Sequence, residues 1–326
     1  MTEPRSAARV DDYQIIAELR RTPACVTYRA SHLRLKRPAT IKLARAAVGV
    51  SANAVLHEAR MLARLRHAGV PTLHHCGVLA DRRAWIAIEP LPERTLADVT
   101  RPLSAPLVVA LVRDLAAILD HAHGGGIVAR VLRPDAIVLP EPGSGGRVMI
   151  ADWYDASLAS ARAPTVHADP AYLAPELVRG GAAEARADIY ALGAIAYRAL
   201  SGIAPTSGRA AAYVSLATRC PAAPAPLTEL IDRMLADAPC DRPATCVEVR
   251  ELAGEALAID DDGDGVTARY DPAALEIELE ASPLLPKPRW TPVHGIPPER
   301  MPADDDFAEL DHSTEEILPE ELALPD

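Results

Sequence analysis

The sequence predicts an α+β fold in two lobes, a small strand-rich N-terminal lobe followed by a larger helical C-terminal lobe. Before residue 90, short apolar segments typical of β-strands alternate with turn-forming residues, and only one segment has helical spacing. After residue 100, the apolar residues follow the spacing of amphipathic or buried helices. From Asp260 onward the chain is acidic and rich in proline, which is typical of a disordered tail.

Five segments of the N-terminal lobe are predicted to be strands. They are residues 13–19, residues 26–30, the segment RPATIKLA that ends near Ala44, residues 73–78 and residues 85–88. Proline has no backbone donor, so Pro38 places the start of the third strand at an edge or a bulge. Residues 51–65 are predicted to form a helix, because one face of that helix would carry Val55, Leu56, Ala59, Leu62 and Leu65.

Four helices are predicted in the C-terminal lobe. They are residues 107–123, 188–200, 227–235 and 247–257. These elements divide the chain into an N-terminal extension (residues 1–12), a folded region (residues 13–259, with lobes at 13–89 and 90–259) and an acidic tail (residues 260–326).

Composition and charge limit the partners, the cell compartment and the cysteine chemistry that we expect of this protein. The 326-residue chain has a net charge of −11, but residues 260–326 hold nineteen acidic and four basic residues, so the folded region is slightly positive. No nucleic-acid partner is expected, because the folded region lacks a dense basic stripe. We expect a cytoplasmic protein without a membrane span, since no apolar run reaches ~18 residues and the first residues form no apolar signal core. The five cysteines include no C-x-x-C pair, which argues against a disulfide framework or a zinc site.

Six short motifs follow one another between residues 39 and 243. ATIK ends at Lys42, LHEARML contains Glu58, and ADWYDA contains Asp152. The three motifs downstream are APE with Glu176, DIYALG beginning at Asp188, and DRP with Arg242. In this order they resemble the motifs of bacterial Ser/Thr protein kinases of the eukaryotic type, over residues 13 to about 256.

The resemblance implies a bilobal protein-kinase-like fold and a role for each motif. Lys42 would hold the α- and β-phosphates of ATP while paired with Glu58, and Asp152 would bind Mg²⁺. The residues that would serve the scaffold are Glu176, Asp188 and Arg242. ATP and Mg²⁺ are therefore the ligands that the resemblance implies.

The segment VARVLRPDAIVL keeps the rhythm of the kinase catalytic loop, H-R-D-L-x-x-x-N, but lacks its chemistry. Ala129 stands at the His position. Val131 stands where an Asp accepts the proton of the substrate hydroxyl, and Ala136 stands where an Asn binds the second metal ion. Arg133 replaces the usual Lys and keeps the charge. Asp135 is out of register for the base, and we expect it at a helix start or on the surface.

The phosphate-binding loop and the metal-binding segment are changed as well. The three glycine positions of G-x-G-x-x-G hold Arg20, Thr22 and Cys25, whose side chains oppose close approach of the backbone to phosphates. In ADWYDA, Trp153 replaces Phe and Tyr154 replaces Gly, which predicts a stiffer backbone. We therefore expect binding of ATP and Mg²⁺ to be weak or absent.

These changes favour a regulatory or scaffolding pseudokinase. The alternative is an atypical Ser/Thr protein kinase of low activity that uses Lys42, Glu58 and Asp152 with a displaced base. A third hypothesis is a calcium-responsive adaptor, because DDDGDGVTARYD at residues 260–271 matches the start of a calcium loop. Calcium binding is not expected, since Asp271 stands where Glu is usual and no second loop follows.

The tail has the features of a segment that binds protein partners. ALEIELEA, residues 274–281, alternates apolar and acidic residues and would either add a strand to a partner's sheet or stay disordered until bound. DDDFAELD, residues 304–311, places the only Phe of the chain among charges. The C-terminal lobe is the other expected partner surface. The residues of the tail expected to bind partners are Leu275, Ile277, Leu279, Trp290 and Phe307.

Deletion of residues 260–326 tests this division of the chain. The tail has too little apolar surface to offset the ~1–2 kcal/mol per residue that backbone ordering costs. We expect the truncated protein to keep its unfolding midpoint in scanning calorimetry and to lose its protein partners. A midpoint many degrees lower would instead show that the tail packs on the folded lobes.

Overall fold

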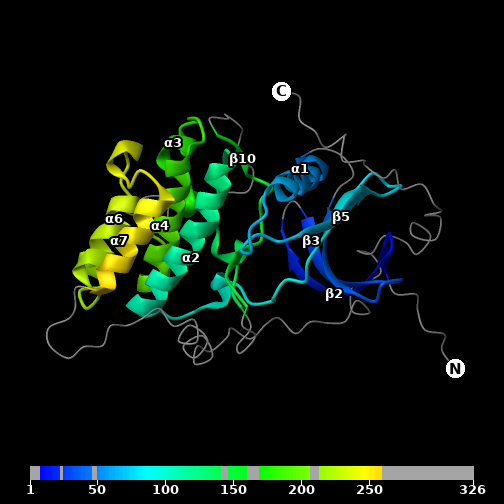
Figure 1. Ribbon diagram of the computed structural model, residues 1–326, viewed down its shortest axis with the longest axis horizontal. Helices are drawn as coiled ribbons and strands as arrows, with labels where there is room; N and C mark the ends of the chain where they lie inside the picture. The colour runs from blue at the N-terminus through cyan, green and yellow to red at the C-terminus, as the bar shows by residue number, and fades with distance from the viewer. Residues whose placement is uncertain are drawn as a thin grey trace. The chain divides into compact units, whose positions relative to one another are not determined.

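The chain folds into two compact units with different secondary structure. One comprises residues 8–64 and 71–93, and the other comprises residues 65–70 and 94–258. The first contains a six-stranded sheet and one helix, and the second is mainly helical (Figure 1). The prediction of an α+β fold, strand-rich first and helical afterwards, is confirmed. The computed structural model describes residues 8–22, 25–45, 50–140, 146–159, 169–205 and 213–258.

The sheet of the first unit has the strand order β1-β2-β3-β4-β6-β5, and every neighbouring pair is antiparallel. Helix α1 packs against β4, β5 and β6. The elements are β1 (Arg9–Val10), β2 (Tyr13–Arg21), β3 (Cys25–His32), β4 (Pro38–Ala44), α1 (Val50–Arg64), β5 (Leu73–Val78) and β6 (Ala84–Ile88).

Pro38 is the first residue of β4, as the sequence predicts. At this position β4 has a neighbouring strand on one side only. Pro38 pairs with Ser31 of β3, whereas pairing of β4 with β6 begins at Thr40. The missing proline N–H therefore interrupts no hydrogen bond between β4 and β6.

The sheet begins at Arg9, inside the segment that the sequence assigns to an extension over residues 1–12. Val10 is almost completely buried, and β1 turns into β2 through Asp11, which has a φ of 49°. Asp tolerates this left-handed conformation better than most residues. A two-residue strand has too few residues to show periodicity, so the sequence pattern does not reveal it.

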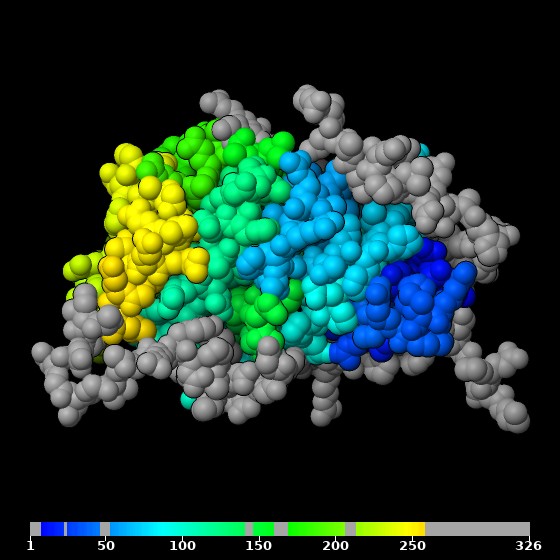
Figure 2. All heavy atoms as spheres, in the orientation of Figure 1, coloured from blue at the N-terminus to red at the C-terminus, as the bar shows by residue number. Residues whose placement is uncertain are grey.

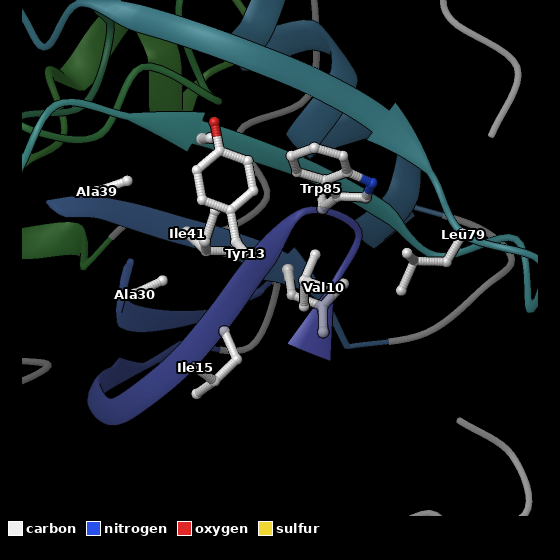
Figure 3. Packing of buried hydrophobic residues seen from close by; sticks show 10 residues of the cluster. Val10, Tyr13, Ile15, Ala30, Ala39, Ile41, Leu79 and Trp85 are labelled. Carbon is white, nitrogen blue, oxygen red and sulfur yellow. The ribbon is translucent and has the colours of Figure 1, made fainter. Parts of the chain in front are cut away.

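The core of the first unit is built around two aromatic side chains. The rings of Tyr13 and Trp85 meet edge to face, with centroids 5.9 Å apart (Figure 3). This geometry is favourable for aromatic pairs. Small aliphatic side chains supply the remaining packing, as expected for a chain with few aromatic residues. They are Val10, Ile15, Ala30, Ala39, Ile41, Leu43, Leu79 and Ala87.

The second unit is organised around helix α2. This helix packs against α4 and α7, and α6 also packs against α4 and α7. Gly193 permits close approach of α4 and α6, because a Cβ at that position would lie 2.8 Å from the Cβ of Met234. The long helices are α2 (Ala105–Gly124), α4 (Ala185–Ser201), α6 (Ala225–Met234) and α7 (Cys246–Ala258).

Helix α7, yellow in Figure 2, buries one face and leaves the other at the surface of the unit.

Short elements connect the long helices. The two small sheets pair β7 with β10 and β8 with β9. The elements are η1 (Leu96–Asp98), β7 (Ile127–Val128), η2 (Pro134–Ala136), β8 (Ile137–Val138), β9 (Met149–Ile150), β10 (Ser157–Leu158), η3 (Pro170–Tyr172), α3 (Pro175–Val178), α5 (Leu216–Arg219) and η4 (Pro239–Asp241).

The division between the units falls after Glu93, four residues beyond the boundary that the sequence predicts. Glu93 forms an ion pair with Arg29 of β3 and so belongs to the first unit. The carbonyl of Arg94 accepts a hydrogen bond from the amide of Leu139 at 2.9 Å, which ties it to the second unit. The segment EPLPERTL, residues 89–96, is predicted to be a connector, but its sequence does not show where the division falls within it, because both contacts are distant along the chain.

A buried arginine joins three parts of the second unit. Arg242 forms two hydrogen bonds with the carboxylate of Glu176, at 2.7 and 2.8 Å. Its guanidinium also donates to the carbonyls of Ala236, Arg186 and Asp237. The five donors of the planar group are thus used, and the side chain is fully buried.

No helix among the described residues is both long and apolar enough to cross a membrane.

The substitution Arg242→Lys tests the importance of this arrangement. Lysine offers three donors and cannot bind the carboxylate and three carbonyls in the same plane, so buried acceptors lose their partners. We expect urea denaturation to show a loss of ~2–4 kcal/mol in unfolding free energy.

Arg233→Lys is the matched control, because the Arg233–Glu248 pair is largely exposed. It should cost less than ~0.5 kcal/mol. Equal effects of the two substitutions would contradict the structural role of Arg242.

Candidate functional site

Lys42 and Glu58 form a buried ion pair in the first unit. Lys42 lies on β4, opposite Thr27 of β3 and Ile86 of β6, and Glu58 lies on α1. The Lys42 Nζ donates to Glu58 Oε1 at 2.7 Å, and the two side chains are 1% and 0% exposed. The structure thus brings together the two residues that the sequence pairs.

Thr22, after β2, and Cys25, at the start of β3, are hydrogen-bonded to each other. The amide of Thr22 donates to the carbonyl of Cys25 at 2.9 Å, and the amide of Cys25 donates to Thr22 Oγ1 at 3.1 Å. Both residues are buried and stand at glycine positions of the kinase pattern. The amides of both residues are therefore engaged in hydrogen bonds with each other's residue.

In the second unit, Asp188 fixes the chain that follows β7. Its carboxylate accepts hydrogen bonds from the amides of Ala129 and Arg130, at 2.8 and 2.6 Å. It also lies 2.8 Å from His123 Nε2 of α2. Asp188 itself is buried on α4. The sequence predicts the scaffold role of Asp188, but it does not reveal the contact with His123.

Arg130 has an unusual backbone conformation, with a φ of 68°. Non-glycine residues in this region carry strain of about 1–2 kcal/mol. The hydrogen bond to Asp188 offsets that strain, and Arg130 Nη1 also donates to the carbonyl of Asp155 at 3.3 Å. Burial lowers the pKa of the Arg130 guanidinium from its usual value, while Asp155 and Asp188 oppose this effect.

The degenerate positions of the loop are packed as apolar core. Ala129, Val131 and Ala136 are all buried, and Val131 is 7% exposed. None of these side chains has an atom that can accept a proton or bind a metal ion. The loop still runs through η2 into β8, and the carbonyl of Ala136 accepts a hydrogen bond from the amide of Ala151 at 2.8 Å.

Arg133 forms a compact ionic cluster with two carboxylates. Its Nη2 donates to Asp152 Oδ2 at 3.1 Å, and its Nε donates to Asp135 Oδ1 at 3.0 Å. The Arg133 and Asp152 side chains are 11% and 9% exposed, so this contact is largely shielded from water. Burial lowers the pKa of Arg133, but the charges of Asp152 and Asp135 and the contact with Tyr154 outweigh it and raise the pKa above its usual value.

Tyr154 completes the cluster from the position of the kinase glycine. Its hydroxyl accepts a hydrogen bond from Arg133 Nη1, and its ring centroid lies 5.5 Å from the guanidinium carbon. Burial, and next the charge of Asp152, raise the pKa of Tyr154 well above its usual value, so the hydroxyl stays neutral at physiological pH. The neighbouring Trp153 is buried, and its Nε1 donates to the carbonyl of Ile150 at 2.8 Å.

A comparison with known proteins shows the family to which this chain belongs. The family model for the protein kinase domain matches residues 24–252. The chain belongs to the protein kinase family.

Its relatives in the family are bacterial serine/threonine-protein kinases. Pkn1 of Myxococcus xanthus is 31% identical over 87% of this chain, which spans 43% of that protein. PknL of Mycobacterium tuberculosis is 28% identical over 79% of this chain and 69% of its own length. RqkA of Deinococcus radiodurans, a DNA damage-responsive kinase by name, is 34% identical over 60% of this chain and 30% of its own length. The chain therefore spans less than half the length of some of its relatives.

The residues of this kinase domain do not fit the Mg²⁺ ions that the family uses. One metal-binding position holds Ala136, which has no ligand atom, and the other holds Asp152, which is bonded to a guanidinium. Mg²⁺ requires near-octahedral oxygen ligands. Among the described residues there is no group of three or more His, Cys, Asp or Glu side chains that could hold a metal ion. The calcium-like segment, residues 260–271, lies outside the described residues.

Asp169 is exposed and caps η3, because its carboxylate accepts a hydrogen bond from the amide of Ala171 at 3.0 Å. The five partner-binding residues predicted in the tail lie outside the described residues. They are Leu275, Ile277, Leu279, Trp290 and Phe307.

Sequence reasoning missed the cluster around Arg133. Arg133 was expected only to keep a charge, and Asp135 was expected at a helix start or on the surface. Asp135 does begin the short helix η2 and is 40% exposed, but it also contacts Arg133. The signal in the sequence is the joint replacement of Gly by Tyr154 and of Lys by Arg133, since a tyrosine hydroxyl and a guanidinium form a natural hydrogen-bonded pair.

The substitution Lys42→Met should strongly destabilise this protein. It leaves the charge of Glu58 buried without its ammonium partner, which costs ~3–5 kcal/mol. Urea denaturation should detect this loss, and the double variant Lys42→Met/Glu58→Met should recover at least half of it, because no buried charge remains.

Arg21→Met is the matched control on the same unit, since Arg21 is about half exposed in its hydrogen-bonded pair with Glu18. It should cost less than ~1 kcal/mol. A Lys42→Met variant as stable as Arg21→Met would contradict the importance of the buried pair.

Proposed function

We propose that this protein is a cytoplasmic pseudokinase: a kinase-fold regulator or scaffold with no effective phosphoryl transfer. The observation that carries the proposal is the burial of Val131 at the position of the catalytic base. A buried valine can neither accept the proton of a hydroxyl nor orient that hydroxyl. The neighbouring carboxylate, Asp135, is bonded to Arg133 and does not supply the missing function.

The absence of the catalytic base should lower the rate of phosphoryl transfer considerably. A positioned acid/base group contributes ~10²–10⁴-fold, and typical kinases turn over at roughly 1–100 s⁻¹. Loss of the base alone would leave about 10⁻⁴–1 s⁻¹. The loss of the metal-binding Asn at Ala136 and of the glycine-rich loop lowers this rate further, although such losses are not additive.

Binding of ATP should be weak or absent for a separate reason. In the family, backbone amides of the glycine-rich loop meet the phosphates. Here the amides of Thr22 and Cys25 are bonded within the turn, and Arg20 also stands in place of a glycine. Lys42 is retained in its pair with Glu58, but a single lysine does not replace the amide donors of the glycine-rich loop.

An atypical Ser/Thr protein kinase of low activity is the second candidate. The observation that favours it is the intact Lys42–Glu58 pair, which kinases need in order to hold the α- and β-phosphates. Phosphoryl transfer depends largely on positioning and charge neutralisation, so a kinase with a displaced base is chemically conceivable. The partners of either form would be proteins, bound through the helical unit or the acidic tail.

A radiolabelled phosphorylation assay tests the proposed function. With γ-labelled ATP and Mg²⁺ or Mn²⁺, we expect no label in the protein or in generic Ser/Thr substrates above background, because the base and a metal ligand are absent. Stoichiometric labelling would support the second candidate, provided that Asp152→Asn abolishes it. Asp152→Asn is preferable to Lys42→Met as the control because it is isosteric.

Calorimetric titration with ATP tests the state of the nucleotide site. We expect a Kd no tighter than ~0.1–1 mM, or about −4 to −5.5 kcal/mol of binding free energy. The physical reason is the loss of the amide donors at the turn between β2 and β3. A low-micromolar Kd would show that the loop binds phosphates without its glycines.

A further inference from the structure

The guanidinium of Arg133 is directed at the residue that binds Mg²⁺ in active kinases. Its three nitrogen atoms are each engaged: Nη2 with Asp152, Nε with Asp135 and Nη1 with the Tyr154 hydroxyl. A second, longer contact joins Nη2 to Asp135 Oδ2 at 3.4 Å. One positive charge is thus shared between two carboxylates and a neutral phenol.

This geometry opposes the binding of a divalent cation at Asp152. A metal ion would have to displace the guanidinium from the carboxylate, or lie close to its positive charge in a site that is largely shielded from water. Ala136 offers no second ligand. Tyr154 occupies the place of a glycine and holds the guanidinium from the other side, so the arginine is constrained to face Asp152.

We infer that Arg133 is a built-in replacement for the divalent cation at Asp152, so that this site takes no Mg²⁺ or Mn²⁺. The inference deepens the proposed function, on which it rests, by assigning the Asp152 site a permanent internal cation. Any phosphate-bearing ligand that the protein binds should then be held without a metal bridge to Asp152.

The contact between Arg133 and Asp152 differs from an ordinary surface ion pair. In the surface pair of Arg179 with Asp237, both side chains are more than half exposed. Arg133 and Asp152 are about nine-tenths buried and share a neutral third partner, Tyr154. A guanidinium with three partners in fixed positions retains its orientation, because its planar fork is already matched to them.

Mn²⁺ binding to the full chain tests the inference, with electron paramagnetic resonance as the measure of free Mn²⁺. The wild-type protein is compared with Asp152→Asn, without nucleotide. The acidic tail contributes the same background to both proteins. We expect identical Mn²⁺ binding, because Arg133 already occupies Asp152. A saturable site in the wild type that Asp152→Asn removes would overturn the inference.

Removal of Arg133 supplies the complementary measurement. Arg133→Met keeps much of the side-chain length without the charge, and should create an Asp152-dependent Mn²⁺ site that the wild type lacks. Arg133→Gln, which keeps an uncharged donor, serves if Arg133→Met does not fold by circular dichroism. A folded Arg133 variant with no Asp152-dependent gain in Mn²⁺ binding would overturn the inference.

The outcomes separate this inference from the proposed function. Asp152-dependent Mn²⁺ binding by the wild type without phosphoryl transfer would contradict the role of Arg133 and leave the pseudokinase intact. Phosphoryl transfer that Asp152→Asn abolishes would contradict the pseudokinase itself.

Discussion

The buried carboxylate of Asp188 is the constraint on which the course of the catalytic-loop segment depends. It holds the amides of Ala129 and Arg130 and the ring of His123, and it thereby maintains a strained, left-handed residue at Arg130. These hydrogen bonds reach main-chain atoms of the loop, so they do not depend on which side chains stand at 129, 131 or 136. Hydrogen bonds of this kind can hold the loop whatever side chains it carries, and the pair of Glu176 with Arg242 connects α3 to the segment before α7.

The side chains at these positions are taken up in contacts within the second unit. Val131 and Ala136 are buried, and Arg133 forms an ion pair with Asp152. The retained Lys42–Glu58 pair is not by itself a sign of catalysis. Loss of either partner would leave an unpaired charge in a buried position, which is costly whether or not ATP ever binds. The pair is therefore expected both in a kinase that needs it for catalysis and in a protein that needs it only for stability. The catalytic-loop segment and the metal-binding segment are what distinguish these two cases.

Local patterns in the sequence were sufficient for much of the fold but not for the new contacts of the site. Helix α2 and strand β4 were predicted near their observed bounds, because their apolar spacing is set by neighbouring residues. The pairing of Lys42 with Glu58 followed from the family pattern. The cluster of Arg133, Asp152 and Tyr154 was missed, because it depends on side-chain directions in segments nineteen and twenty-one residues apart. Strand β1 was missed because two residues are too few to show a period.

A single-turnover experiment tests the central claim, that the kinase fold survives here without its chemistry. The protein is kept in large excess over γ-labelled ATP with Mg²⁺, and ADP is quantified over hours, so that one transfer to any acceptor, including water, is detected. The account predicts ADP formation at the rate of buffer alone. ADP formation well above that rate, and lost in Asp152→Asn, would contradict it.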